Sequence, residues 1–422
     1  MRPADLAALQ LERLRWTVRW ATSRVPFHAQ RCAAAGVSAA DLRGLEDIAR
    51  LPFMIKADLR AHYPDGLWAV PRSEVARIQG TSGTRGKPTL TAYTRADLDV
   101  WAEVVARSLA AAGVRAGDLV HVAYGYGLFT GGLGLHGGAE RLGASVLPAS
   151  SGNTPRQLLL LQDLRPRVLC CTPSYALHLA DAMRNEDIDP RSIGIEIGIF
   201  GAEPWTEAMR RHIEQAFGCR ALDIYGLAEV IGPGVAMQSA TDGEGLFIWE
   251  DHFYPEVIDP VGGAPLPEGA EGELVFTSLT KQAFPLIRYR TGDLCTLSRA
   301  PAPSGRTHVR MSRLRGRADD MLVVRGVNVF PSEIERVVVG APGLSAHYEL
   351  VLTRDGALDV LTVRVEASHA ENSGDADLGA LGARIAQELS ATLGIGAHVQ
   401  VERPGALVRS EGKAVRLVDR RG

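Results

Sequence analysis

Cysteine is scarce in this sequence, and no cysteine pattern points to a metal site or a disulfide framework. The cysteines form no CxxC pair and no Cys/His spacing typical of zinc, and their number is odd. We therefore expect free, buried thiols in a reducing compartment. The five residues are Cys32, Cys170, Cys171, Cys219 and Cys295.

Long apolar runs are also missing. The amino terminus, MRPADLAALQLERLRWTVRW, has the apolar spacing of a helix, but Arg and Glu are mixed into it, so it lacks the uninterrupted apolar region of a secretory signal. No stretch approaches the roughly 20 apolar residues that span a bilayer. We expect a cytoplasmic protein that does not act in a membrane.

An excess of charge of either sign is absent as well. The 46 Lys+Arg residues against 49 Asp+Glu leave a net charge of −3, which provides no field for nucleic acid or a membrane surface. Aromatic residues make up only 6% within 46% hydrophobic residues, as in an ordinary globular protein. With 422 residues, the chain is long enough for two or three domains and a substantial core. A small neutral or anionic substrate is the expected ligand.

From residue 77 onward, short apolar strands alternate with amphipathic helices, after a largely helical beginning. This alternation predicts right-handed βαβ units and a mostly parallel sheet covered by helices. The predicted strands are 76–80, 118–124, 144–149, 167–173 and 194–200. The predicted helices are 98–113, 132–143, 154–166, 174–185 and 206–218.

The pattern changes twice further along the chain. From about residue 240, short strands and turns predict a β-rich lobe. A compact α+β pattern follows it, and a charged, glycine-flanked segment at Asp319 separates the two, so we place 1–318 in one domain and 319–422 in another. The polar segment 369–377 is predicted to be a mobile loop. The helices predicted in the second domain are 331–340 and 377–394.

The glycine-rich stretch GTSGTRGKP, from Gly80 to Pro88, suits a triphosphate. Its glycines let the main chain approach a ligand, its Thr and Ser residues offer hydroxyls, and Arg85 and Lys87 offer positive charge. It is not a Walker A loop, because five residues rather than four separate Gly80 from Gly86, and because Pro88 stands where a Ser or Thr is needed for Mg²⁺. Taken alone, the stretch is also compatible with a glycine-rich hairpin that has a polar tip.

Four weaker signals follow. Tyr225 in YGLAE can stack on a flat base, and Glu229 can hold a metal ion. Asp293 in RTGD can accept hydrogen bonds from paired ribose hydroxyls, although an ordinary Asp turn has the same pattern. Arg317 in GRADD supplies a guanidinium for phosphate or ribose oxygens. Lys413 lies near the end of the chain, where a lone lysine is usually just solvated.

The order of these motifs resembles the adenylate-forming superfamily of acyl-CoA synthetases, and within it the phenylacetate-CoA ligase family. The resemblance covers nearly the whole chain, in FMIKADLRAHYP, YGYGLFTGGLGLH, GIFGAEPWTEAMR, IYGLAEVIGPGVAM, WEDHFYPEVIDP and SEGKAVRLVDRR. It implies an α/β fold, in which a large amino-terminal domain has parallel sheets and a β-rich lobe, and a small α+β carboxy-terminal domain swivels. It also implies two half-reactions: a carboxylate and MgATP give acyl-AMP and pyrophosphate, and coenzyme A then takes the acyl group.

The resemblance also implies a role for each motif residue. Lys413 is implied to bridge carboxylate and phosphate in the first transition state, a catalytic role that it shares with the Mg²⁺-binding Glu229. Asp319 is implied to be the hinge, and Gly326 to line the coenzyme A tunnel. The implied ATP- and AMP-binding residues are Thr81, Ser82, Gly83, Thr84, Gly86, Lys87, Ala202, Glu203, Tyr225, Gly226, Asp293 and Arg317.

Two stretches are implied to surround the aromatic ring of the acid, YGYGLFTGGLGLH and the residues after YGLAE. For Phe129 and Ile231, simple core packing is an equal alternative. The implied acyl-pocket residues are Tyr126, Phe129, Thr130, His136, Gly201, Ile231, Gly232 and Pro233.

Three positions depart from the family pattern. Phenylacetate-CoA ligases usually have Cys in place of Ser239, His in place of Phe247 and Tyr in place of Gly137. Because the Cys and His would be zinc ligands, we predict no zinc site there, despite His252. Gly137 and Leu135 change the volume near the implied pocket, so that a hydroxy- or aminobenzoate is an alternative to phenylacetate.

The sequence thus predicts an AMP-forming aryl acid–CoA ligase that uses ATP, Mg²⁺ and coenzyme A. Its partner is expected to be a small aromatic carboxylate, with no nucleic acid or membrane, and a homodimer is one possible assembly. One alternative is an aryl acid-adenylating enzyme that transfers the acyl group to a hydroxyl or amine. A different class, an ADP-releasing ATPase or a non-catalytic nucleotide-binding module, is disfavoured by the failed Walker A pattern and by Lys413, respectively.

Overall fold

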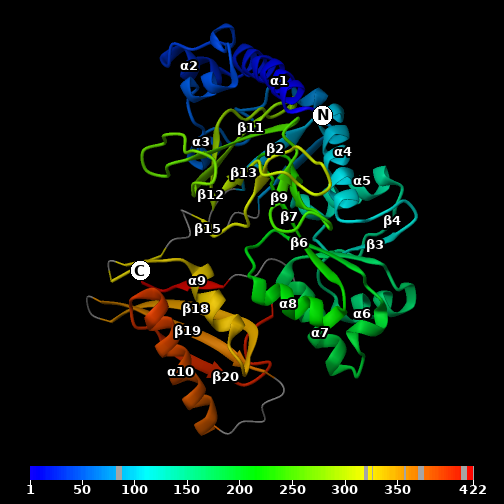
Figure 1. Ribbon diagram of the computed structural model, residues 1–422, viewed down its shortest axis with the longest axis vertical. Helices are drawn as coiled ribbons and strands as arrows, with labels where there is room; N and C mark the ends of the chain where they lie inside the picture. The colour runs from blue at the N-terminus through cyan, green and yellow to red at the C-terminus, as the bar shows by residue number, and fades with distance from the viewer. Residues whose placement is uncertain are drawn as a thin grey trace. The chain divides into compact units, whose positions relative to one another are not determined.

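The structure is a computed structural model, and it divides the chain into two compact units (Figure 1). It describes residues 1–81, 88–317, 322–325, 327–355, 358–368, 375–409 and 416–421. Unit 1 contains Met1–Ser150, Arg167–Cys170 and Leu222–Leu314, and unit 2 contains Ser151–Pro166, Cys171–Ala221 and Arg315–Gly422. The domain boundary at Asp319 stays a prediction, because Asp319 lies outside the described residues.

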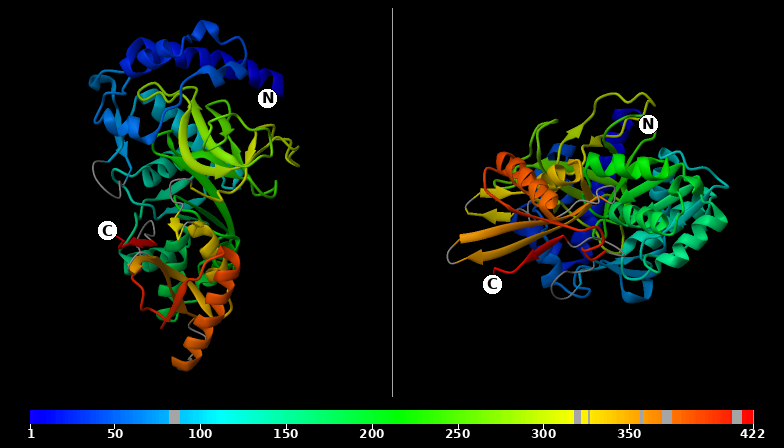
Figure 2. Two further views of the ribbon diagram at one scale, coloured as in Figure 1. Left: turned by 90° about the vertical axis from the view of Figure 1, so that its left-hand side faces the viewer. Right: turned by 90° about the horizontal axis from the view of Figure 1, so that it is seen from below.

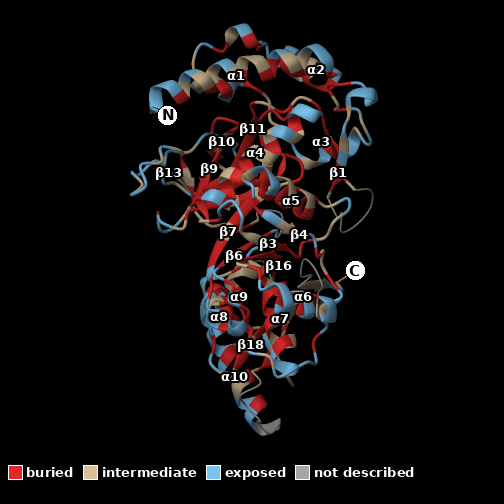
Figure 3. Ribbon diagram, turned by 90° about the vertical axis from the view of Figure 1, so that its right-hand side faces the viewer, coloured by how far each residue is buried: buried red, intermediate tan, exposed pale blue. Residues whose placement is uncertain are grey.

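Unit 1 begins with helices, as predicted. α1 (Pro3–Arg24) and α2 (Pro26–Ala34) both have a proline in the first turn, where the missing N–H leaves no intrahelical bond unmade. Leu14 of α1 is buried in a cluster with Leu279, while the outer side of α1 is exposed (Figure 3). The short helix α3 is Lys56–Ala61. Single 3₁₀ turns cover Ala39–Asp41, Leu45–Arg50, Arg72–Glu74 and, in unit 2, Pro190–Ile193.

The strands of unit 1 form a parallel and an antiparallel set. β3 (Leu119–Val122) is parallel to β4 (Ser145–Leu147) and to β5 (Val168–Cys171), which confirms the predicted parallel pairing. The antiparallel set has the order β13 (Leu297–Ser298), β14 (Arg310–Met311), β9 (Leu246–Ile248), β8 (Gly232–Gln238) and β7 (Arg220–Leu227). The strands are therefore more mixed than expected, because the chain after YGLAE turns straight back onto β7 instead of crossing over through a helix.

Two helices pack against β8 and against each other, α4 (Arg95–Ala111) and α5 (Thr130–Leu142). α4 starts where it does because Thr94 and Asp97 form a reciprocal capping box, each side chain accepting a hydrogen bond from the other residue's N–H. α5 ends at Gly143, whose backbone has a left-handed φ of 86°. Both helices were predicted to within three residues at each end.

The remaining strands of unit 1 build a hairpin and a second sheet. β1 (Arg77–Gly80) and β2 (Leu90–Tyr93) form the antiparallel hairpin. β10 (Phe253–Ile258), β11 (Gly272–Ser278) and β12 (Tyr289–Cys295) pair in antiparallel fashion in that order. This sheet confirms the predicted β-rich lobe, and Figure 3 shows its central strand β11 as buried.

Unit 2 combines helices from the middle of the chain with its carboxy-terminal part. The former are α6 (Thr154–Leu164), α7 (Pro173–Asn185) and α8 (Glu207–Phe217), with the strand β6 (Ile197–Gly201). The latter begins with the short strands β15 (Gly316–Arg317), β16 (Leu322–Val324) and β17 (Val327–Val329), of which β16 and β17 pair.

The carboxy-terminal part continues as the predicted α+β structure. Its sheet has the strand order β20 (His398–Glu402), β19 (Leu358–Ala367), β18 (Leu344–Asp355) and β21 (Leu417–Asp419). The helices α9 (Pro331–Gly340) and α10 (Asp375–Leu393) pack on this sheet and on each other (Figure 2). Of the predicted mobile loop, 369–374 lie outside the described residues, and α10 already includes 375–377.

Candidate active site

The hairpin β1–β2 carries both ends of the predicted phosphate segment. Gly80 pairs with Leu90, and the N–H of Thr81 donates to the carbonyl of Thr89 at 3.1 Å. The N–H of Gly80 also donates to the carbonyl of Leu128 at 2.8 Å, which ties the hairpin to the loop before α5. The predicted residues Ser82, Gly83, Thr84, Gly86 and Lys87 lie outside the described residues.

Tyr225 and Asp293, predicted to bind adenine and ribose, are in direct contact. The Tyr225 hydroxyl of β7 donates a hydrogen bond to Oδ2 of Asp293 on β12 over 2.6 Å, and both side chains are buried. The ring of Tyr225 stacks on Phe276 of β11, with 6.3 Å between centroids. A hydrogen bond to a carboxylate is stronger than one between neutral groups. The bond therefore fixes the orientation of the Asp293 carboxylate, and the roles of both residues stay predictions.

Tyr225→Phe is expected to raise the KM for ATP about tenfold, because a hydrogen bond to a charged group contributes roughly 1.5–3 kcal/mol and its loss removes one constraint on the orientation of the Asp293 carboxylate. Steady-state kinetics with varied ATP measure this. Tyr254→Phe, on β10 at the other side of β11 from β12, serves as the matched control and should leave the KM unchanged. An unaltered KM in Tyr225→Phe would separate this bond from nucleotide binding.

The loop 228–231, between β7 and β8, and the start of β8 are held through their main-chain oxygens. The Tyr93 hydroxyl donates to the carbonyl of Ile231 at 2.9 Å, and Nε1 of Trp101 donates to the carbonyl of Pro233 at 3.0 Å. The Tyr93 and Trp101 rings stack with centroids 5.0 Å apart. The Glu229 carbonyl accepts a hydrogen bond from Nζ of Lys281 at 3.0 Å. The predicted metal residue Glu229 therefore extends from a fixed and buried backbone.

Sequence reasoning missed these donors, Tyr93, Trp101 and Lys281. Trp101 lies on the apolar face of a predicted helix, which gives it no distinguishing signal. Lys281 does have one, since it is a single charge within the apolar run TSLTKQAFPLI. Burial lowers the pKa of Lys281 to about 7, although the nearby carboxylates of Asp97 and Glu229 act in the opposite direction.

Two of the predicted acyl-pocket residues, one before α5 and one within it, are in contact. The Tyr126 hydroxyl is 3.3 Å from Nδ1 of His136, and their rings meet edge to face at 5.9 Å. His136 also faces the Glu140 carboxylate, with 3.1 Å between Nε2 and Oε1. Thr130 is buried in the first turn of α5, while Phe129, just before the helix, is only half-buried.

The residues after YGLAE pack against the start of α5. A Cβ added to Gly232 would lie 2.4 Å from the Trp101 ring and 3.0 Å from Thr130, and Gly232 has a φ of +118°. Only glycine permits so close an approach with this backbone. Ile231 is 1% exposed, which agrees with the core alternative for this residue as well as with a pocket lining.

Three of the predicted residues of unit 2 lie at the end of β6. Gly201 is the last residue of this strand, and Ala202 has a left-handed φ of 70°, which is uncommon for a residue with a side chain. Oε1 of Glu203 accepts a hydrogen bond from the N–H of Ser174 at 2.8 Å, near the start of α7. Arg317 belongs to β15. The predicted Asp319, Gly326 and Lys413 lie outside the described residues.

Metal-ligating side chains are dispersed. Within the described ranges, no group of three or more His, Cys, Asp and Glu side chains could hold a metal ion. His252 bonds to other groups, since its Nδ1 lies 2.9 Å from the Thr280 hydroxyl and its Nε2 lies 3.3 Å from the Asp251 carboxylate. Burial lowers the pKa of His252 to about 4. The absence of zinc stays a prediction.

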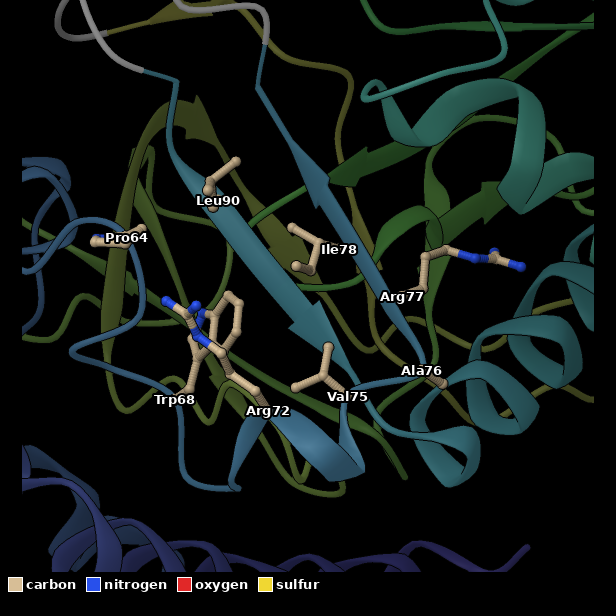
Figure 4. Close-up of a pocket in the computed structure, with 8 residues that line it drawn as sticks. All are labelled: Pro64, Trp68, Arg72, Val75, Ala76, Arg77, Ile78 and Leu90. Carbon is tan, nitrogen blue, oxygen red and sulfur yellow. The ribbon is translucent and has the colours of Figure 1, made fainter.

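Two cavities are lined by none of the predicted site residues. The one in unit 1 has a volume of about 330 Å³ and lies beside the hairpin β1–β2 (Figure 4). Its lining residues are Pro64, Trp68, Arg72, Val75, Ala76, Arg77, Ile78 and Leu90. The other, of about 500 Å³, lies in unit 2 between α7 and the sheet of β18, and its arginines Arg364, Arg409 and Arg416 are paired with glutamates.

The two units each contain part of the chain that matches a known family. The family described as AMP-binding enzyme matches residues 10–280, and the AMP-binding enzyme C-terminal domain matches 326–421. No helix in the described part of the chain is both long and apolar enough to cross a membrane.

Curated relatives and a solved structure match nearly the whole chain. The phenylacetate-coenzyme A ligase of Thermus thermophilus is 51% identical over 98% of this chain and 96% of its own length. The corresponding ligase of Escherichia coli is 48% identical over 99% and 95%, respectively. A 2-hydroxyisobutyryl-CoA ligase, solved in the postadenylation state with 2-HIB-AMP, matches with a TM-score of 0.93 and 33% identity over 99% of this chain and 90% of that chain. These matches confirm the resemblance, the fold and the enzyme class expected from the sequence, and the chain belongs to the phenylacetate-coenzyme A ligase family of AMP-binding enzymes.

Proposed function

We propose that the chain joins an aryl acid, in the first place phenylacetate, to coenzyme A at the expense of ATP. The observation that carries this proposal is the full-length similarity to phenylacetate-coenzyme A ligases, four of which are 48–51% identical over at least 95% of their own length. The 33% identity to a ligase of a small hydroxy acid is lower, so an aromatic acid is the better choice.

In the proposed first half-reaction, a carboxylate oxygen attacks the α-phosphorus of ATP, and the bond to pyrophosphate breaks. The segment 81–87 binds the departing phosphates, Tyr225 stacks on the base and Asp293 accepts hydrogen bonds from the ribose. The 2.6 Å bond between Tyr225 and Asp293 supports this, because it places the ring and the carboxylate side by side. The resemblance assigns Ala202 and Glu203 to the lining of the base, and Arg317 to the phosphate or ribose oxygens.

Glu229 is proposed to hold the magnesium ion of MgATP. Proteins commonly bind Mg²⁺ with one or two carboxylates together with phosphate oxygens of the substrate. A single buried Glu229 on a fixed backbone fits that coordination, although no larger cluster of ligating side chains is present among the described residues. Bound Mg²⁺ supplies positive charge for the phosphate oxygens.

In the proposed second half-reaction, the thiol of coenzyme A attacks the acyl carbon, and AMP leaves. The resemblance supplies Asp319 as the hinge of the required rotation and Gly326 as the opening for the pantetheine arm. Transfer to a hydroxyl or amine remains the alternative outcome of the same first step, and no described residue favours it.

The surroundings of Gly137 help to choose between phenylacetate and a hydroxy- or aminobenzoate as the substrate. A Cβ added at Gly137 would have a single neighbour within 4 Å, the Cβ of Ala102 on α4 at 4.0 Å. A side chain at this position therefore starts on the side of α5 that faces α4. This supports phenylacetate over the benzoates as the first acid to test.

Exchange of labelled pyrophosphate into ATP tests the proposed function directly. We expect exchange that depends on phenylacetate, and AMP release that rises when coenzyme A is added. The acids to compare are phenylacetate, hydroxy- and aminobenzoates and 2-hydroxyisobutyrate. If no acid supports exchange, the chain does not adenylate, and if coenzyme A leaves AMP release unchanged, the acyl acceptor is another nucleophile.

A further inference from the structure

Lys281 is a buried lysine between β11 and β12 that the reaction scheme above does not use. Its side chain is 2% exposed, and its Nζ donates hydrogen bonds to the Thr91 hydroxyl at 2.8 Å and to the Glu229 carbonyl at 3.0 Å. Nζ also lies 4.7 Å from the centre of the Tyr93 ring and 5.3 Å from that of Phe284. The ammonium therefore connects two segments that lie far apart in the sequence.

Those two segments are the ones that carry the proposed triphosphate chemistry. Thr91 is in β2, the strand that leads out of the phosphate segment 82–87, and it is paired with Gln79 of β1. Glu229 is the proposed magnesium residue. A single ammonium thus joins strand β2, close to the phosphate segment, to the backbone of the loop 228–231.

The backbone of Lys281 is itself fixed. The buried carboxylate of Asp97, in the first turn of α4, accepts hydrogen bonds from the N–H groups of Gln282 at 2.6 Å and Ala283 at 2.9 Å. The same carboxylate accepts the N–H of Thr94 in the capping box of α4. Lys281 therefore extends from a rigid support, so that its two hydrogen bonds hold their partners in place.

The composition of the chain points to the same residue. Of 46 basic residues only four are lysines, Lys56, Lys87, Lys281 and Lys413, and the rest are arginines. Lys87 and Lys413 already have proposed roles at the phosphates. Arginine carries a larger, planar group, whereas an ammonium is a compact donor. A chain that otherwise uses arginine retains lysine at 281, where a compact donor makes both bonds.

We propose that Lys281 is a positioning residue for metal–nucleotide binding. It holds the loop 228–231 against the hairpin β1–β2, so that both segments can contact the same triphosphate. This inference rests on the proposed roles of Glu229 and of the segment 81–87. It assigns to Lys281 no contact with substrate.

A positioning role and a purely electrostatic role predict different results for Lys281→Arg. The complex of Mn²⁺ with ATP carries a net negative charge, so a purely electrostatic Lys281 would attract it, and a guanidinium would serve equally well. A positioning Lys281 instead needs the compact ammonium to reach both acceptors, and the larger planar group would move the loop and the hairpin apart and weaken binding. Wild-type affinity in Lys281→Arg would therefore identify an electrostatic role and overturn the positioning role.

The experiment measures the dissociation constant of the Mn²⁺–ATP complex from the full chain, by equilibrium dialysis of labelled ATP in the presence of excess Mn²⁺. We expect Lys281→Met to weaken binding about tenfold, in the range found when residues that orient a metal ligand are replaced. Thr91→Val, which removes one of the two acceptors and keeps the shape, should weaken it by a smaller factor. Unchanged or tighter binding in Lys281→Met overturns the proposal.

Ser108→Ala is the matched control for general loss of stability. Ser108 is fully buried in α4 and accepts a hydrogen bond from Nε1 of Trp249 at 3.0 Å, far along the sequence from the loop of Glu229. Its replacement should lower the unfolding temperature and leave Mn²⁺ binding unchanged. If Lys281→Met does not fold, Thr91→Val decides, and wild-type affinity in folded Thr91→Val overturns the link to the hairpin.

The same measurement separates this inference from the proposed function. If the wild-type chain binds Mn²⁺ with ATP but exchanges no pyrophosphate with any acid, the proposed function fails while the binding constants still decide the role of Lys281. If the wild-type chain does not bind Mn²⁺ with ATP at all, the role of Lys281 is overturned.

Discussion

Lys413→Ala is expected to lower phenylacetate-dependent pyrophosphate exchange about 10²- to 10³-fold, the loss seen when one group that stabilises developing charge is removed from an active site. The resemblance places Lys413 between the acid's carboxylate and the α-phosphate, where negative charge shifts in the first transition state. The second half-reaction starts from acyl-AMP, in which that bond has already formed. Thioester formation from supplied phenylacetyl-AMP and coenzyme A should therefore stay within about threefold of wild type, since it does not use this interaction.

The two half-reactions of Lys413→Ala must be measured separately, by pyrophosphate exchange and by consumption of supplied acyl-AMP. Lys56→Ala is the control, because Lys56 stands in the first turn of α3 and has no proposed role. It should retain both half-reactions. Equal loss of both in Lys413→Ala would contradict the specific role and would indicate a structural one.

The order of the elements was predictable from two independent signals in the sequence. One is the spacing of the apolar residues, which differs between helices and strands, and the other is the turn residues that separate the elements. The helix 331–340 was predicted at both ends, since Pro331 opens it and the next segment turns apolar with a period of two. The direction of β8 was not predictable. The reversal after Leu227 depends on how Gly226 and Gly232 approach each other, and sequence period carries no information about that contact.

For the site, motifs identified residues but not the contacts that hold them. Tyr225 and Asp293 were both predicted, yet their hydrogen bond joins strands 68 positions apart. The bond from Lys281 to Thr91 spans 190 positions. Such pairings follow from the tertiary fold alone. The residues that support a site can therefore not be identified from the sequence, whereas its glycine-rich and acidic motifs can.

Gly226→Ala is expected to disrupt the predicted nucleotide site through the backbone. A Cβ added at Gly226 would lie 1.8 Å from the carbonyl oxygen of Gly232 and 2.8 Å from Cα of Pro233. These are main-chain atoms, which cannot turn aside as a side chain can, so β8 must move away from β7. The pairing is already irregular here, because the register shifts between Tyr225 and Gly226. Forcing a methyl group into so close a contact costs about 3 kcal/mol or more.

The movement of β8 would displace two parts of the predicted nucleotide site. These are Tyr225, on the adjacent strand β7, and the loop 228–231, which leads into β8. We expect pyrophosphate exchange below detection and a lower midpoint of urea unfolding, followed by tryptophan fluorescence. Gly137→Ala is the matched control. Gly137 lies inside α5, and its new Cβ would contact only Ala102 at 4.0 Å, without a clash. Because alanine has a higher helix propensity than glycine, the free energy of unfolding should rise by up to about 1 kcal/mol, with activity retained. Wild-type exchange in Gly226→Ala would show that β7 and β8 can separate without harm, and the contact would then not define the site.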